Sequence, residues 1–193
     1  MIRRLHESDR GFTLIELVVS LALGVIGLVI VGGMLISTMK AQSSVREAAQ
    51  SSNTGLFVAK TLTRDVRAAR ELSATPSSAG TCLLRLTVVD NALTTPVSVR
   101  YVAWYYGNEE IRTKRSASAI AVPASPAAVA TWTLLASGVR QADSTPVFST
   151  SGPQVEISFK VAGASGAPVL IQTTATSRQP MPTPGPGMST PCS

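Results

Sequence analysis

A long apolar run near the beginning of the chain constrains the fold more than any other feature. From Leu17 to Met39 the sequence contains no Asp, Glu, Lys or Arg. A helix rises about 1.5 Å per residue, so a run of this length spans roughly 30 Å, the thickness of the hydrocarbon core of a bilayer. We therefore expect one membrane-spanning helix, with the remainder of the chain forming one domain of ordinary size.

Two familiar kinds of N-terminal segment do not account for this run. It is longer than the apolar region of an ordinary cleaved secretory signal, and no clear small-residue cleavage site follows it. A plain membrane anchor has no use for Glu16, a carboxylate that is costly at membrane depth. Arg3 and Arg4 precede the run. By the positive-inside tendency, this basic side stays cytoplasmic and the rest of the chain lies outside the inner membrane.

The residues Gly11-Phe12-Thr13-Leu14-Ile15-Glu16 resemble the cleavage signal of type IV prepilins and pseudopilins. The resemblance implies that residues 1–11 are a leader, which the prepilin peptidase removes before methylating the new N-terminal Phe12. It implies that residues 12–39 form the transmembrane helix and the filament core. It further implies assembly with other minor and major pilins on an inner-membrane platform, with the head in the periplasm and later in the filament.

Glu16 has a physical role in such a filament. Its carboxylate is expected to pair with the α-amino group of Phe12 in a neighbouring subunit. In a core of low dielectric constant this attraction is strong, and a misplaced subunit leaves a buried charge unpaired. The sequence therefore predicts that Phe12 and Glu16 direct subunit assembly, after cleavage behind Gly11.

Residues 40–72 are predicted to continue the helix. Apolar residues recur there at spacings of three and four, which is typical of an amphipathic helix packed on a globular head. Gly55 is a weak point, where we expect a kink. Asp65 is predicted to lie on a polar face. The basic residues Arg64, Arg67 and Arg70 are interpreted as a solvated face in preference to a nucleic-acid patch.

The predicted head, residues 73–178, is rich in β-strand signals. Alternating or apolar runs, separated by turn residues, predict strands at residues 82–89, 97–106, 109–114, 132–135, 147–148, 155–161 and 169–176. The low-complexity stretch 117–130 is interpreted as a surface loop. Residues 179–193 form a proline-rich tail. The fold class is therefore α+β and pilin-like, with a long N-terminal helix packed on an antiparallel β-sheet head.

The chain has two cysteines, Cys82 and Cys192. In an oxidising compartment they are able to form an intramolecular disulfide, which many pilins have near the C-terminus. Closing so long a loop would stabilise the head by up to about 4 to 5 kcal/mol in the entropic description. Two free thiols and a bond between subunits are the alternatives.

Catalytic, metal and cofactor sites find no support in the sequence. The one histidine, His6, lies in the predicted leader, so the mature chain has no Cys-His pair and no metal-ligand cluster. The paired carboxylates Glu109 and Glu110 stand beside a predicted turn, and adjacent residues of a strand point apart. We therefore predict no enzyme activity and no cofactor.

More distant features resemble particular subfamilies. Residues 53–67 look like the helix end of PilW-type minor pilins, as does the later order of Tyr101, Arg112 and residues 134–139. The resemblance implies a minor pilin that primes pilus assembly, is placed at the tip, and supports twitching, adhesion or DNA uptake. GspJ-type minor pseudopilins of type II secretion share this layout. A third hypothesis, a DNA-binding competence subunit, rests on the net charge of +6.

Overall fold

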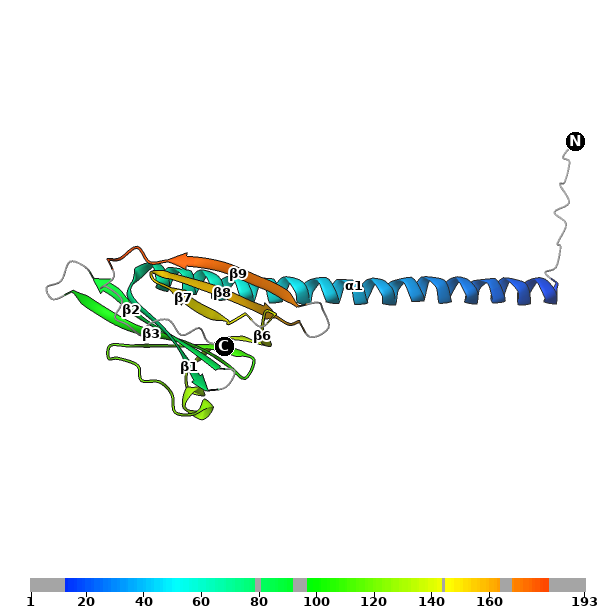
Figure 1. The fold of residues 1–193 in the computed structure, drawn as a ribbon. Coiled ribbons are helices and arrows are strands. Elements are labelled where there is room, and N and C mark those ends of the chain that lie inside the picture. Colours follow the sequence, from blue (N-terminus) through cyan, green and yellow to red (C-terminus); the bar gives the residue numbers. More distant parts are fainter. Residues whose placement is uncertain (1–12, 79–80, 92–96, 144, 164–167, 181–193) are drawn as a thin grey trace, which may run out of the picture. The chain divides into compact units, whose positions relative to one another are not determined.

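The computed structural model describes residues 13–78, 81–91, 97–143, 145–163 and 168–180. The chain divides into two compact units, Met1–Ser44 and Val45–Ser193. Helix α1 (Leu14–Ala68) begins in the first unit and ends in the second, and all strands belong to the second unit (Figure 1). The α+β fold class, with a long N-terminal helix and antiparallel sheets, is confirmed.

Helix α1 ends at Ala68 and not at residue 72, where the sequence predicted its end. Residues 69–72 instead begin strand β1 (Ala69–Ser78). Ala, Arg, Glu and Leu are good helix formers, so local propensity favoured a longer helix. Tertiary contacts override it: Arg178 N–H donates to the carbonyl oxygen of Arg67 at 3.1 Å, and the Ser177 hydroxyl donates to that of Ala69. The first bond satisfies a carbonyl group that the helix end leaves without a partner, and the second fixes the first residue of β1.

The first sheet has five strands in the order of the chain, each antiparallel to the next. They are β1, β2 (Thr81–Asn91), β3 (Ser98–Gly107), β4 (Glu110–Ser116) and β5 (Thr133–Ser137). The sequence predicted a turn at Gly107 and Asn108, and the structure has it one residue later. Gly107 still pairs with Glu110, and Asn108 and Glu109 form a two-residue loop in which both have positive φ. Pro76 is accommodated because β1 is an edge strand, where a missing N–H breaks no inner ladder.

The second sheet has four strands, where the sequence had led us to expect a single sheet. Its central strand β8 (Gln154–Val161) pairs on one side with β6 (Val139–Gln141) and β7 (Phe148–Ser151), and on the other with β9 (Val169–Thr176). The bounds of β9 agree with the prediction. β6 is too short to produce a period-2 signal, and so the sequence did not reveal it.

One hydrophobic core joins α1 to both sheets. Val58, Leu62 and Val66 lie on one helix face and pack with Trp104 and Phe159, all fully buried. This burial confirms that the second half of α1 is amphipathic and packs on the head.

Gly55 belongs to the same helix face, and it marks a close approach of α1 to β9. A Cβ atom at Gly55 would lie 2.5 Å from Cγ1 of Ile171, so a larger residue would require the Ile171 side chain or the helix to shift. Helix α1 continues through Gly55 without interruption. The close approach to Ile171 gives this glycine a packing role, and the kink stays a prediction.

A smaller cluster covers the opposite face of the first sheet. Tyr105 on β3 packs edge-on against Trp132, with ring centroids 6.3 Å apart, and Val129 of the short helix η1 (Pro126–Val129) is buried with them. Residues 117–130, interpreted from the sequence as a surface loop, thus include buried residues that shield the sheet from water. The loop's low complexity concealed this role.

Candidate processing and assembly site

Helix α1 begins with a capped first turn. The Thr13 hydroxyl oxygen accepts a hydrogen bond from the Glu16 N–H at 3.4 Å, and the Thr13 carbonyl oxygen accepts one from Leu17 N–H at 3.2 Å. Thr13 is therefore the N-cap and Glu16 the third helical residue, the spacing of a capping box. A carboxylate in the first turn also interacts favourably with the positive end of the helix dipole.

The capping role of Thr13 was not among the sequence predictions. The Thr-x-x-Glu pattern before an apolar run was the signal that would have found it. Of the other predicted processing residues, Gly11 and Phe12 lie outside the described residues. The structure thus places Glu16 in the first turn, and the roles of Gly11, Phe12 and Glu16 in cleavage and assembly stay predictions.

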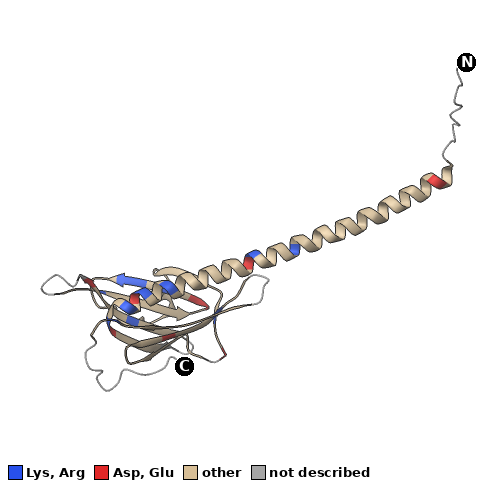
Figure 2. Cartoon of the chain, turned by 90° about the horizontal axis from the view of Figure 1, so that it is seen from above, with Lys and Arg blue, Asp and Glu red and all other residues tan. Residues whose placement is uncertain are grey.

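The apolar side chains that follow Glu16 are exposed on every face of the helix. Leu17, Leu28 and Met39 have 59%, 74% and 63% of their surface accessible to solvent. By length and composition α1 is apolar enough to cross a membrane, and Figure 2 shows this long stretch without charged residues. Apolar area in water costs roughly 25 cal/mol per Å², so a surface this large requires lipid or other helices around it.

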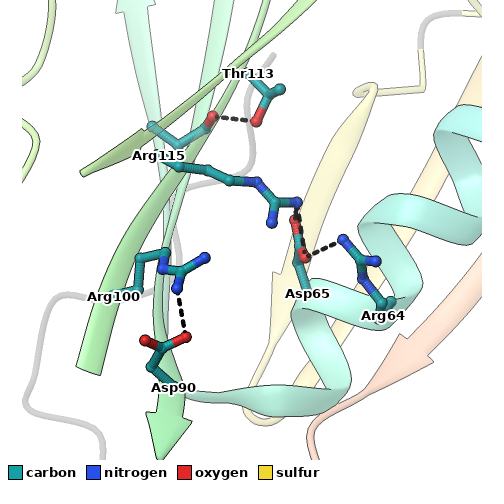
Figure 3. Close-up of polar contacts among 7 residues, drawn as sticks. Arg64, Asp65, Asp90, Arg100, Thr113 and Arg115 are labelled. Carbon is teal, nitrogen blue, oxygen red and sulfur yellow. Dashed lines mark hydrogen bonds and ion pairs between the residues drawn. The ribbon is translucent and has the colours of Figure 1, made fainter. Parts of the chain in front are cut away.

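In the second unit, α1 is tied to the first sheet by a charged pair. The Arg115 guanidinium on β4 donates to both carboxylate oxygens of Asp65, at 2.9 and 3.1 Å (Figure 3). The Arg64 guanidinium approaches the same carboxylate at 3.6 Å. The Asp65 side chain is 5% exposed and that of Arg115 is 36% exposed. Asp65 was predicted to lie on a polar face; the structure corrects this.

The environment of Asp65 changes its protonation. Burial raises the pKa of this carboxyl above its ordinary value of 3.8, while Arg115, Arg64 and the Trp104 indole partly lower it again. The indole nitrogen is buried and makes no hydrogen bond of good geometry within the described residues. Trp104 therefore lowers the pKa of Asp65 less than Arg115 and Arg64 do. Asp65 falls on the same helix face as Leu62 and Val58, at spacings of three and seven, and this periodicity was the missed signal.

The paired carboxylates, predicted to point apart, bind different partners. Glu109 accepts from Arg140 at 3.0 Å, and Glu110 accepts from Arg112 at 2.7 Å. Each carboxylate thus has its own arginine, an arrangement that stabilises the turn between β3 and β4. Within the described ranges, no group of three or more His, Cys, Asp or Glu residues is placed to hold a metal ion.

Cys82 lies near the start of β2, with its sulfur 3.8 Å from the carbonyl oxygen of Phe148. It is 2% exposed and belongs to the main core. Cys192 lies outside the described residues. The disulfide between them stays a prediction, which intact-mass measurement after alkylation, with and without reductant, would test.

Residues 8–32 match the family model for the prokaryotic N-terminal methylation motif. The match includes Gly11, Phe12 and Glu16, and it supports a type IV pilin-like prepilin signal. Such a signal implies processing by the prepilin peptidase, membrane anchoring, and assembly with other pilins as a structural subunit. Neither the curated proteins nor the solved structures gave a match to this chain.

Proposed function

We propose that this chain is a minor pilin of PilW type, a subunit of a type IV pilus that primes filament assembly at the tip. The observation that carries the proposal is the pairing of a methylation motif at residues 8–32 with a helix whose apolar side chains are exposed on all faces. In the inner membrane, lipid covers these side chains. In the filament, the helices of neighbouring subunits cover them. The head lies in the periplasm before assembly and faces outward in the filament.

Glu16 supplies the specificity that apolar packing lacks. Apolar contacts stabilise many registers between two helices almost equally, whereas a carboxylate needs a partner at one position. After cleavage behind Gly11, the free α-amino group of Phe12 is that partner on a neighbouring subunit. The capping bond from Glu16 N–H to Thr13 uses the backbone of Glu16 only, so its carboxylate remains available.

The first test is the mass of the N-terminus after expression with and without the prepilin peptidase. We expect a chain that begins with methylated Phe12, and an intact leader when the peptidase is absent. An intact leader in both strains would refute the proposal and leave a simple anchored domain.

The second test separates processing from assembly. Glu16→Gln should be cleaved normally but recovered poorly in sheared filaments, because the pairing charge is gone. Glu47→Gln is the matched control, since it removes one carboxylate from the same helix outside residues 8–32. Equal recovery of Glu16→Gln and the control would show that the Glu16 charge has no role in assembly.

The third test distinguishes a type IV pilus from a type II secretion system. Deletion of the gene should abolish surface pili and twitching and leave secretion of folded proteins into the medium intact. Loss of that secretion with normal pili would assign the chain to the GspJ-like pseudopilins and overturn the minor-pilin role.

A further inference from the structure

A groove of about 740 Å³ lies between α1 and β9 in the second unit. One wall is the helix, with Leu56, Lys60 and Arg67 among its lining residues, and the other is β9 from Leu170 to Thr173. Leu56 and Leu170 are 46% and 50% exposed, so apolar surface is accessible in the groove. The groove therefore offers both an apolar floor and a strand as contact surfaces.

The β9 wall of the groove is the edge of the strand. Neighbouring residues Leu170 and Ile171 have side chains on opposite faces of the sheet, yet both line the groove. A groove that touches both faces of one strand must run along its edge. Among the described residues, β9 pairs with β8 alone, and this leaves its second edge without a strand.

The hydrogen bonds show which backbone groups are on that edge. Ser177 N–H donates to Pro153 O at 2.8 Å, so in this register the odd-numbered residues of β9 face β8. Successive residues of a strand turn their N–H and C=O groups to opposite sides. The backbone N–H and C=O groups of Leu170, Gln172 and Thr174 therefore point away from β8. They are placed to form hydrogen bonds with an added strand.

The groove is strongly cationic. Its lining includes the four basic residues Lys60, Arg64, Arg67 and Arg178, and no acidic residue among those described. The Arg64 side chain is 69% exposed, and its approach to Asp65 at 3.6 Å is a weak ion pair. Like charges held side by side repel, and a negatively charged partner would relieve this repulsion.

We infer that this groove binds an extended acidic segment of a partner protein, which adds as a strand to the free edge of β9. Backbone hydrogen bonds to Leu170, Gln172 and Thr174 supply affinity, as in other strand-addition complexes. Carboxylates of the segment pair with Lys60 and Arg67, and its apolar side chains cover the exposed Leu56 and Leu170. The inference concerns the head and does not depend on cleavage behind Gly11.

The lining favours a peptide over a nucleic acid. Proteins that bind single-stranded DNA or RNA provide aromatic side chains on which bases stack. No aromatic residue lines the described walls of this groove. The phosphate oxygens of a nucleic acid only accept hydrogen bonds, so they would leave the outward carbonyl oxygens of β9 without partners. A peptide strand pairs with both the N–H and the C=O groups.

The test uses the full chain in detergent and a fluorescent synthetic peptide of about eight residues that alternates Glu with Val. We expect saturable binding by anisotropy, and slower hydrogen exchange over residues 169–176 when the peptide is present. A peptide that alternates Lys with Val should not bind. Equal binding of the two peptides, or binding without protection of β9, would overturn the inference.

Charge variants test the role of the basic residues. Lys60→Gln together with Arg67→Gln should weaken binding by about tenfold, from the loss of two charge contacts. Lys40→Gln together with Arg46→Gln is the matched control, with the same change in charge on the same helix outside the groove, and it should bind as the parent chain does. An equal loss in both double variants would show a general charge effect and contradict the docking site.

A backbone variant tests strand addition. Gln172→Pro removes one outward N–H without removing a bond to β8, whereas Gln172→Ala keeps that N–H. We expect the proline variant to bind several-fold more weakly than the alanine variant. If the proline variant does not fold, the exchange measurement on the parent chain decides the question.

The same assay would reveal either of two other occupants of the groove. If an oligonucleotide displaces the peptide and binds more tightly, the ligand of the groove is a nucleic acid and the inference is overturned. Stronger peptide binding after deletion of residues 181–193 would show that the chain's own tail competes for the groove, and this would overturn the assignment to a partner.

Discussion

Leucine side chains in the two parts of helix α1 have opposite burial. Leu28, in the first unit, is 74% exposed, whereas Leu62, in the second, is 0% exposed. In the second unit two sheets cover the helix and close a core around it. In the first unit no described residue covers the helix. An apolar helix thus shows only that a partner is needed, and the fold of the head decides where the chain itself supplies one.

The strongest test of this comparison replaces one leucine in each part. Leu62→Ala should lower the free energy of unfolding of the head by about 2 to 5 kcal/mol, because it leaves a cavity in a closed core. Leu28→Ala should change it by less than about 0.5 kcal/mol. Denaturation followed by tryptophan fluorescence measures this cleanly, since both tryptophans, Trp104 and Trp132, lie in the second unit. Similar losses from the two variants would contradict the division into units.

Removing the arginine from the buried charged pair should have the next largest effect. Arg115→Leu should cost about 2 kcal/mol near neutral pH, because it leaves the buried Asp65 carboxylate without its main partner; the partial exposure of Arg115 moderates the loss. Urea denaturation at several pH values would measure it.

The sign of the pH dependence follows from the raised pKa of Asp65. The folded head binds a proton more tightly than the unfolded chain does, so this group's contribution to stability is full below pH 3.8 and is lost as pH rises through the folded pKa. Arg115 lowers that pKa, and its removal raises it further. The cost of Arg115→Leu should therefore shrink as pH falls. Adding Asp65→Asn should abolish this dependence, and a cost that grows on acidification would contradict the assignment.

A smaller effect is expected at the closest approach of α1 to the second sheet. Gly55→Ala should cost about 1 kcal/mol, since crowding against Ile171 outweighs the gain in helix propensity. Combining it with Ile171→Ala should cost less than the sum of the two single changes, which a double-mutant cycle would detect. Gly27→Ala, in open space in the first unit, is the control. Strict additivity would show that the two sites do not touch.

The smallest effect is expected from an exposed ion pair. The Arg140 and Glu109 side chains are 67% and 54% exposed, so Arg140→Ala should change stability by less than about 0.5 kcal/mol. A loss as large as that of Arg115→Leu would mean that burial does not separate the two pairs.

Periodicity and composition alone determined much of this protein. The charge-free run after Glu16, the cleavage motif and the alternation in residues 155–161 and 169–176 each express a local pattern, which the neighbours of a residue in sequence suffice to reveal. The processing segment was therefore identified without any structure, and so was the α+β class.

The tertiary structure alone decided the features that depend on residues distant in sequence. The helix ends at Ala68, where the segment after β9 bonds to the carbonyl oxygens of Arg67 in α1 and of Ala69 in β1. Asp65 is buried because Arg115, fifty residues away, compensates its charge. Gly55 is needed because Ile171 approaches it. Each of these outcomes is set by the energy of a contact between distant residues, and local propensities carry no information about such contacts.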